Sequence, residues 1–202
     1  MTPETMLQFL HTAELLKCRT RHSYTSSGRH ESVAEHSWRT ALMAELLRPE
    51  FPQLDMDRVV TMCLLHDLGE AVTGDIPTFE KTKTDEETEE AAIFRLLAAL
   101  PQPTRSRMEA LFDEMLALGS AEARLYKALD RMEAVISHNE APLETWLPLE
   151  YDLQRTYGVR EAASDPTLAA LRAAVLRETE EKIAAGTEPA KENRAAKTPL
   201  CL

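Results

Sequence analysis

A histidine followed by an aspartate lies inside a long apolar stretch of this sequence. His66 and Asp67 directly follow the apolar run 59–65, VVTMCLL. A helix that is apolar on nearly every side lies at the centre of its domain, where an unpaired imidazole or carboxylate is costly. A divalent cation compensates both groups, because it binds neutral imidazole nitrogen and carboxylate oxygen together. The doublet is therefore the predicted centre of the chemistry.

The composition limits the classes of function that are open to the chain. It has 202 residues, of which 44% are hydrophobic and 28% charged, and a net charge of -11. An acidic surface disfavours polymeric nucleic acid as a partner, because its phosphates need a basic surface. The sequence has neither a bilayer-spanning apolar stretch nor a signal-peptide pattern, so we expect a cytoplasmic protein without a membrane partner.

One short segment departs from this acidic balance. Residues 17–30 carry four cationic side chains and two histidines, and the first acid after them is Glu31. A basic segment on an acidic protein suits a small anionic ligand, although a solvated basic loop is the alternative.

Helical periodicity covers nearly every long segment, and no alternating strand pattern is found. We therefore expect an all-α, single-domain helical bundle over residues 1–186, with a flexible tail over 187–202 that lacks a periodic apolar face. Capping boxes are predicted at Ser32 with Glu35 and at Thr84 with Glu87. The stretch 73–83 is expected to be an active-site loop, and a polar loop is expected around 26–28. The main predicted helices are 3–17, 32–48, 55–70, 84–100, 120–139 and 165–186.

Two further residues join the doublet as candidate metal ligands. His36 falls on the same helical face as Val33 and Thr40, and Asp130 lies beside an apolar stripe. Taken alone, such a histidine is more often a core residue, and such an aspartate more often pairs with a neighbouring cation. Together with His66 and Asp67 they supply two imidazoles and two carboxylates, a donor set that fits Mn, Co, Fe, Ni or Zn.

The order of these residues resembles that of the HD-domain phosphohydrolases, and within them the 5'-deoxynucleotidase branch. The resemblance extends over about residues 9–157 and rests on ESVAEHS at 31–37, HDLGE at 66–70, GDIP at 74–77 and ALD at 128–130. It implies that one divalent metal ion is bound by His36, His66, Asp67 and Asp130. Dinuclear relatives hold a second metal with additional histidines between the doublet and the last aspartate. This chain has none there, which favours a mononuclear site.

Two carboxylates near the doublet are the candidate reacting groups. Glu70 lies one turn beyond His66, and Asp75 follows Gly74, which permits a sharp return of the loop. Both resemble residues that act on substrate or water in the deoxynucleotidase branch. The alternatives are a surface acid at a helix end for Glu70 and a loop cap for Asp75.

Arg21 matches the position at which the related deoxynucleotidases use an arginine to hold the phosphate, and its planar guanidinium can contact two phosphate oxygens. The related enzymes carry Trp at the next position, where it helps to distinguish deoxyribose from ribose. This chain has His22 there. We therefore expect Glu70, Asp75 and Arg21 to be catalytic, and Arg21, His22 and Asp75 to bind substrate.

The resemblance implies removal of the 5'-phosphate from (deoxy)nucleoside monophosphates by a metal-activated water. Hydrolysis of another nucleotide, cyclic or diphosphate, is an alternative. So is a non-catalytic regulatory module that binds metal or nucleotide, and a purely structural helical protein is a third. The resemblance also implies a homodimer.

Overall fold

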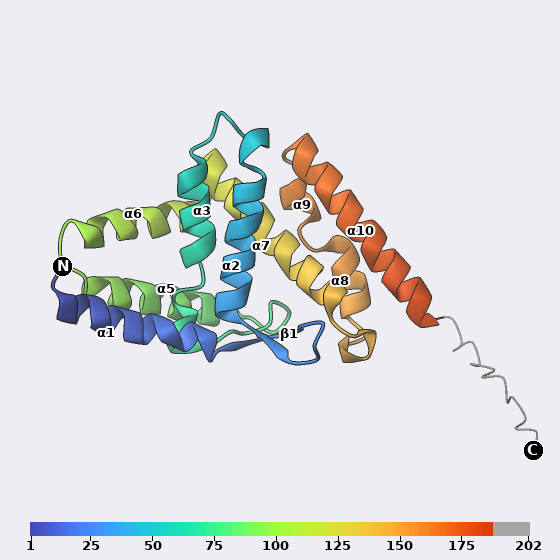
Figure 1. Cartoon of the computed structure of the whole chain (residues 1–202), viewed down its shortest axis with the longest axis horizontal. Coiled ribbons are helices and arrows are strands. Elements are labelled where there is room, and N and C mark those ends of the chain that lie inside the picture. Colours follow the sequence, from blue (N-terminus) through green and yellow to red (C-terminus); the bar gives the residue numbers. More distant parts are fainter. Residues whose placement is uncertain (188–202) are drawn as a thin grey trace, which may run out of the picture.

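The computed structural model describes residues 1–187, which form a helical bundle with one short hairpin (Figure 1). The α-helices are α1 (Pro3–Ala13), α2 (Val33–Leu46), α3 (Met56–Leu65), α4 (Glu70–Thr73), α5 (Lys83–Ala98), α6 (Thr104–Ala117), α7 (Ala121–Glu140), α8 (Glu150–Thr156), α9 (Val159–Ala162) and α10 (Pro166–Thr187). Three short 3-10 helices are η1 (Glu14–Lys17), η2 (Arg48–Glu50) and η3 (Leu143–Thr145). The strands are β1 (Thr20–Tyr24) and β2 (His30–Ser32).

Helices α2, α3 and α7 pack against one another at the centre of the bundle. In Figure 1, α1, α5 and α6 lie on one side of them, and α8, α9 and α10 lie on the other. The central helices bury Val59 and Met62 from α3 and Leu129 and Met132 from α7 with no exposed surface. Burial of apolar side chains at this scale is the main force that stabilises a bundle. The expected central position of the helix before the doublet is confirmed.

Several predicted helix starts are found as expected. Ser32 and Glu35 form a reciprocal capping box at the start of α2, in which each side chain bonds the backbone N–H of the other residue. Asp55 accepts the N–H of Arg58 at the start of α3, and Ser120 caps α7 in the same way. These caps satisfy amide groups that the helix itself leaves unpaired.

The sequence analysis missed the hairpin. Strands β1 and β2 pair in antiparallel register, with Thr20 opposite Ser32 and Tyr24 opposite His30. Gly28 in the connecting turn has a φ of 82°, a conformation that glycine adopts without steric cost. Strand β1 reads TRHSY and has no alternating apolar face, so the usual signal of a half-buried strand is absent.

Two boundaries also differ from prediction. Helix α3 ends at Leu65 rather than near residue 70, and a separate short helix, α4, follows after a turn. The capping box before α5 uses Thr82 with Asp85, not Thr84 with Glu87. The sequence TKTDEE offers two capping registers two residues apart, and Asp85 supplies the carboxylate that reaches back to the N–H of Thr82.

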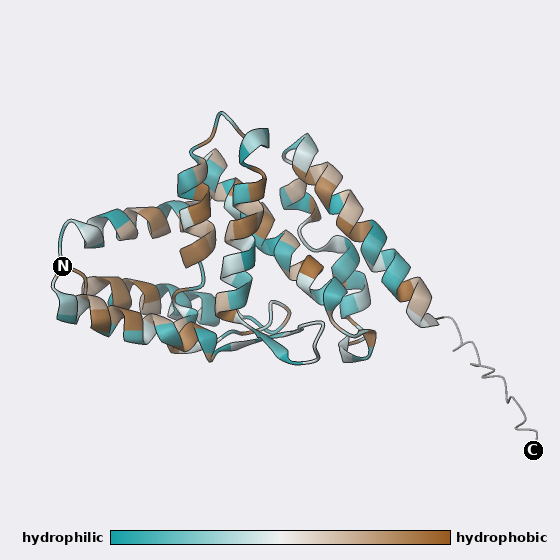
Figure 2. Cartoon of the chain, viewed as in Figure 1, coloured by the Kyte–Doolittle hydropathy of each residue, from teal (hydrophilic) through white to brown (hydrophobic). Residues whose placement is uncertain are grey.

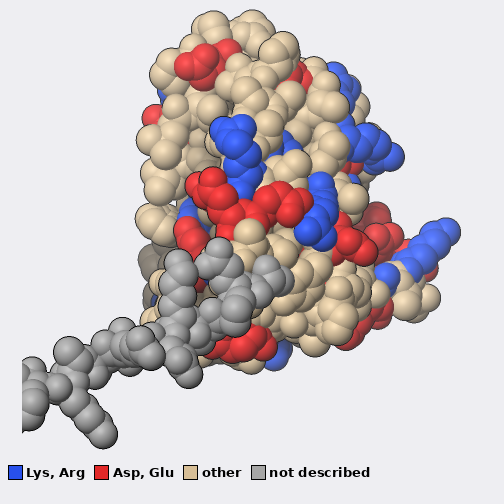
Figure 3. All heavy atoms as spheres, turned by 90° about the vertical axis from the view of Figure 1, so that its right-hand side faces the viewer, with Lys and Arg blue, Asp and Glu red and all other residues tan. Residues whose placement is uncertain are grey.

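Figure 2 shows hydrophobic residues along α1 and on the central helices. The face shown in Figure 3 carries acidic side chains interspersed with basic ones. No helix within residues 1–187 combines the length and the apolar character that crossing a bilayer requires. The tail predicted for 187–202 lies outside the described residues, except for the backbone of Thr187 at the end of α10.

We predict that Gly69→Ala destabilises the protein by about 1–3 kcal/mol, because an added methyl group overpacks a tight contact. A Cβ atom at Gly69, between α3 and α4, would lie 2.7 Å from Cγ1 of Ile93 and 3.1 Å from the carbonyl oxygen of Glu89. Gly119→Ala is the control, since a Cβ there would meet no atom within 4 Å. Urea unfolding of both variants measures the difference, and equal midpoints would contradict the prediction.

Candidate metal centre and adjoining cavity

The four predicted metal ligands converge at the junction of α2, α3 and α7. The Nε2 atoms of His36 and His66 are 3.2 Å apart. Oδ1 of Asp130 lies 3.1 Å from Nε2 of His36 and 3.5 Å from Nε2 of His66. Oδ2 of Asp67 lies 3.1 Å from Nε2 of His66 and 3.7 Å from Nε2 of His36. Residues separated by up to 94 positions in sequence thus direct their donor atoms toward one point.

Both imidazoles are held so that Nε2 faces this point. Nδ1 of His66 donates to the carbonyl oxygen of Cys63 at 2.8 Å. Nδ1 of His36 donates to Oε2 of Glu133, one turn along α7 from Asp130, and Glu133 has no exposed surface. Because each Nδ1 carries the ring proton, each Nε2 of the neutral ring presents a lone pair. An acceptor on the outer nitrogen is the usual support of a metal-binding histidine.

The arrangement fits a divalent cation. Two imidazole lone pairs and two carboxylate oxygens face one another, and the buried Oδ2 of Asp67 has no hydrogen-bond partner in the described chain. Donor atoms bound to one transition metal at about 2.0–2.2 Å lie about 3.0–3.5 Å from each other, close to the separations found here. Burial lowers the pKa of His66, but Asp67 and Asp130 outweigh it and raise that pKa to about 10. The negative charge of the site therefore favours a bound positive charge.

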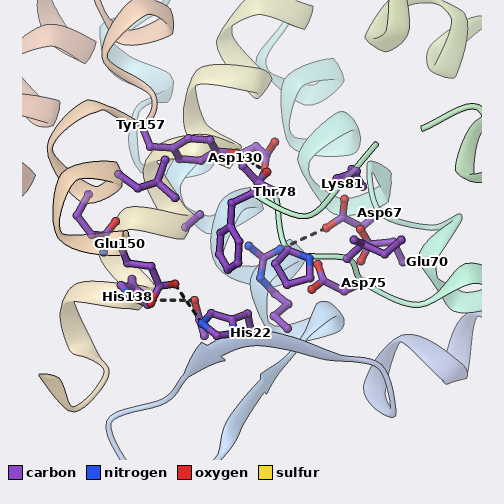
Figure 4. A pocket seen from close by; sticks show the side chains of 18 of the residues that line it. His22, Asp67, Glu70, Asp75, Thr78, Lys81, Asp130, His138, Glu150 and Tyr157 are labelled. Carbon is purple, nitrogen blue, oxygen red and sulfur yellow. Dashed lines mark hydrogen bonds and ion pairs between the residues drawn. The ribbon is translucent and has the colours of Figure 1, made fainter. Parts of the chain in front are cut away.

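A cavity opens beside these donors (Figure 4). Six of the eight predicted site residues line it, namely Arg21, His22, Asp67, Glu70, Asp75 and Asp130. The other two, His36 and His66, are not part of the cavity lining but lie within 4 Å of Asp67 and Asp130. Strand β1 of the hairpin carries Arg21 and His22 and places both at the cavity.

Arg21 lies between two carboxylates at the edge of the metal centre. Its Nη1 is 3.7 Å from Oδ2 of Asp67, and its Nε is 3.4 Å from Oε2 of Glu31. Nε is buried and forms no hydrogen bond within residues 1–187. Glu31 in turn accepts the hydroxyl of Ser137 at 3.0 Å. Arg21 is thus a partly exposed guanidinium fixed beside the doublet, with hydrogen-bonding capacity left for a ligand.

Glu70 and Asp75 are two carboxylates that line the same cavity, close enough for the charge of Asp75 to act on Glu70. Burial, followed by the negative charges of Asp67 and Asp75, raises the pKa of Glu70 to about 10. Burial also raises the pKa of Asp75, although Arg21 opposes the shift. Oε2 of Glu70 has no hydrogen-bond partner among the described residues. These effects favour the protonated form of Glu70, whereas Arg21 favours the ionised form, and a divalent cation at the four donors would lower the pKa of Glu70 further.

The end of the cavity away from the metal donors is built from different groups. Oε1 of Glu150 lies 3.1 Å from Nε2 of His22, and its Oε2 lies 3.3 Å from Nε2 of His138. Figure 4 shows these three side chains together, across the cavity from Asp67, Glu70 and Asp75. The ring of Phe79 meets the ring of His22 edge to face, and Tyr157 also lines the cavity. An aromatic and polar wall suits a nucleoside better than a bare phosphate.

Several residues of this site were not predicted from the sequence, among them Glu133, Glu150, His138 and Phe79. Glu133 was detectable as an acid one turn after Asp130 on the same apolar face of α7. Lys127 is the neighbouring cation that pairs with Asp130: its Nζ lies 2.7 Å from Oδ2. The other oxygen of the same carboxylate, Oδ1, faces Nε2 of His36. Glu150 had no signal, because only folding brings α8 to the hairpin.

Several known proteins are similar to this chain in sequence or in fold. Residues 13–172 match the HD domain family. The human 5'-deoxynucleotidase HDDC2 is 34% identical over 139 residues, which span 67% of this chain and 67% of the human protein. The 5'-deoxynucleotidase YBR242W of Saccharomyces cerevisiae is 28% identical over 142 residues, covering 66% of this chain and 59% of the yeast protein. The crystal structure of a "predicted metal-dependent phosphohydrolase" from Magnetospirillum magnetotacticum is 30% identical with a TM-score of 0.74, covering 89% of this chain and 93% of that one.

We predict that Glu133→Gln weakens metal binding by about 10- to 100-fold, because His36 loses the carboxylate that fixes its ring. Glu140→Gln is the matched control. Glu140 also pairs with Arg39, a partner of Glu133, but it is half exposed and does not contact His36. Titration of metal-free protein with Mn²⁺ or Co²⁺ gives both affinities. Equal affinities in the two variants would show that Glu133 does not support the site.

Proposed function

Because the chain belongs to the HD-domain family of metal-dependent phosphohydrolases and is 5'-deoxynucleotidase-like, we propose that it removes the 5'-phosphate of (deoxy)nucleoside monophosphates. The observation that carries the proposal is the placement of four metal-type donors beside a cavity that Arg21 lines near the donors and that has a nucleoside-compatible opposite end. The relatives named 5'-deoxynucleotidase support the same substrate class.

We assign His36, His66, Asp67 and Asp130 as ligands of one divalent cation, with Mn, Co, Fe, Ni and Zn all compatible with the donor set. A bound cation would supply Lewis-acid polarisation of a phosphoryl oxygen and lower the pKa of water. Cys63 O and Glu133 keep the two imidazoles oriented for this role. Lys127 restrains Asp130 through its second carboxylate oxygen.

Arg21 is the proposed phosphate-binding residue. Its guanidinium lies beside Asp67 and lines the cavity, so a phosphate placed next to the cation also meets Arg21. Two N–H groups in one plane can bond two phosphoryl oxygens and stabilise the charge that develops on them.

Glu70 and Asp75 are proposed to handle the proton of the attacking water. Both line the cavity, and neither forms an ion pair within 4 Å in the described chain. Glu70 sits where burial favours the protonated form and a cation favours the ionised one, so it can accept a proton and later release it. Asp75 lies close enough to Arg21 for the guanidinium to lower its pKa. It is proposed to orient water or substrate.

His22, His138 and Glu150 are proposed to contact the nucleoside. Nε2 of His22 and Nε2 of His138 lie 3.1 and 3.3 Å from the two carboxylate oxygens of Glu150. Neither nitrogen forms a hydrogen bond within the described residues, so both remain available to a substrate. His22 is the residue that differs from the related enzymes, so the sugar preference depends on it.

The homodimer and the cytoplasmic location expected from the sequence stay predictions. Exposed large apolar side chains occur on α1, at Met6, Leu7 and Leu10, and on α2, at Trp38, Leu42 and Leu46. An apolar surface of this kind is compatible with the expected homodimer. A cytoplasmic location and the absence of a polymeric nucleic-acid partner are likewise proposed from the sequence alone.

The proposal predicts release of inorganic phosphate from 5'-mononucleotides by the metal-loaded protein. A panel of ribo- and deoxyribonucleoside 5'-monophosphates, 3'-monophosphates, cyclic nucleotides and diphosphates tests it. Asp67→Asn should lose both metal and phosphate release, because one of four donors is neutralised. Conversion of cyclic nucleotides to monophosphates, or phosphate release from diphosphates, without release from 5'-monophosphates would assign the chain to the alternative substrate class. Full activity of Asp67→Asn would refute metal-assisted hydrolysis at this site.

Glu70→Gln should retain the metal but lower kcat by about 10²- to 10⁴-fold, because an amide cannot transfer the proton. Glu80→Gln in the same loop region is the control, since Glu80 is exposed and does not line the cavity. Metal content is measured by elemental analysis and turnover by phosphate release. An unchanged kcat in Glu70→Gln would remove Glu70 from the mechanism.

A further inference from the structure

A second cavity lies on α7 next to α9, outside the site described above. It is lined by Arg124, Lys127 and Arg131 of α7, by Arg160 and Glu161 of α9, and by Ser164. The three residues of α7 are spaced by three and four positions, so they form one row along the helix surface. The packing of α9 against α7 places the other side chains opposite this row.

The charge of this cavity opposes that of the protein. Four cationic side chains line it against a single carboxylate, whereas the whole chain carries a net charge of -11. Oε1 of Glu161 is shared, since it lies 2.8 Å from Nη1 of Arg131 and 3.1 Å from Nη2 of Arg160. Lys127 pairs outside the cavity lining with Asp130, so two carboxylates face four cations and an excess positive charge remains.

Several donors in the cavity remain available to a ligand. Nε of Arg131 is buried and has no hydrogen-bond partner among the described residues. The guanidinium of Arg131 is fixed over the ring of Tyr157, 5.4 Å from its centroid. Arg124 bonds only the backbone carbonyls of Leu118 and Gly119 and pairs with no carboxylate within residues 1–187. A buried donor without a partner is costly, and a bound acceptor would remove that cost.

We propose that this cavity is a second anion site that binds a phosphate group, distinct from the site of hydrolysis. Multivalent phosphate matches the excess of positive charge, and the planar guanidinium groups bond its oxygens in pairs. The hydroxyl of Ser164 adds a neutral donor at the same cavity. Lys127 lines both cavities, so the second site lies next to the metal centre, on the opposite side of the Lys127–Asp130 contact.

Equilibrium dialysis with labelled inorganic phosphate tests this proposal. The full chain with its resident metal is used in an Arg21→Ala background, which weakens phosphate binding at the metal centre. We expect one bound phosphate per chain. Adding Arg124→Glu and Arg160→Glu should weaken this binding by about tenfold or more, because two charged donors are replaced by repelling groups. Neither residue lines the cavity beside the metal.

The matched control is Arg107→Glu with Arg177→Glu in the same background. Both residues are exposed on other helices, line neither cavity and change the net charge by the same amount. This control should keep the bound phosphate. Unchanged binding in the Arg124 and Arg160 variant, or an equal loss in the control, would overturn the proposal. Arg124→Gln with Arg160→Gln serves as a second test if thermal unfolding shows that the glutamate pair disturbs the fold.

Competition identifies the source of the phosphate group. A nucleoside triphosphate that displaces the label at lower concentration than pyrophosphate would assign the site to a nucleotide. Displacement by pyrophosphate at equal or lower concentration would assign it to free inorganic phosphate. If neither competitor displaces the label, the result would contradict a phosphate site. Because the readout is binding in a background without Arg21, it is independent of whether the hydrolysis proposed above is correct.

Discussion

The whole site depends on two histidine side chains whose Nε2 atoms face each other at the junction of three helices. His36 and His66 each donate a hydrogen bond from Nδ1 to a fixed acceptor, and their Nε2 atoms face each other at 3.2 Å with carboxylate oxygens beside them. Four electron-rich atoms in such proximity are unfavourable without a positive charge among them. The packing of α2, α3 and α7 holds this arrangement together, and a cation relieves it. Metal binding and the stability of the central bundle are therefore coupled.

Around this centre, cationic and anionic side chains line one cavity from different elements of the fold. Arg21 reaches the metal donors from the hairpin, while Glu70 and Asp75 approach from α4 and the loop after it. The opposite end carries histidines bridged by Glu150 and the ring of Phe79. A nucleoside monophosphate has the same polarity, with a dianionic phosphate at one end and a flat, polar base at the other. The polarity of the cavity thus matches that of the substrate class.

Helix α7 serves more than one purpose in this structure. One face supplies Asp130 and Glu133 to the metal centre, and an adjacent face supplies Arg124 and Arg131 to the second cavity. Lys127 lies between these faces and touches Asp130. A single long helix thereby links an acidic metal centre to a basic cavity over a few residues.

The sequence by itself determined the helical character of the chain and the main caps, because apolar periodicity and capping residues act locally. It also pointed to the residues that the structure brings together: His66 and Asp67 stand out because polar groups in an apolar helix require compensation, and the resemblance to HD-domain proteins adds His36 and Asp130. Only the tertiary structure decided the hairpin that carries Arg21, the partner Glu133 behind His36, and the contact of Glu150 with His22. These features join residues far apart in the chain through packing and charge, and no local pattern records which distant side chains will meet.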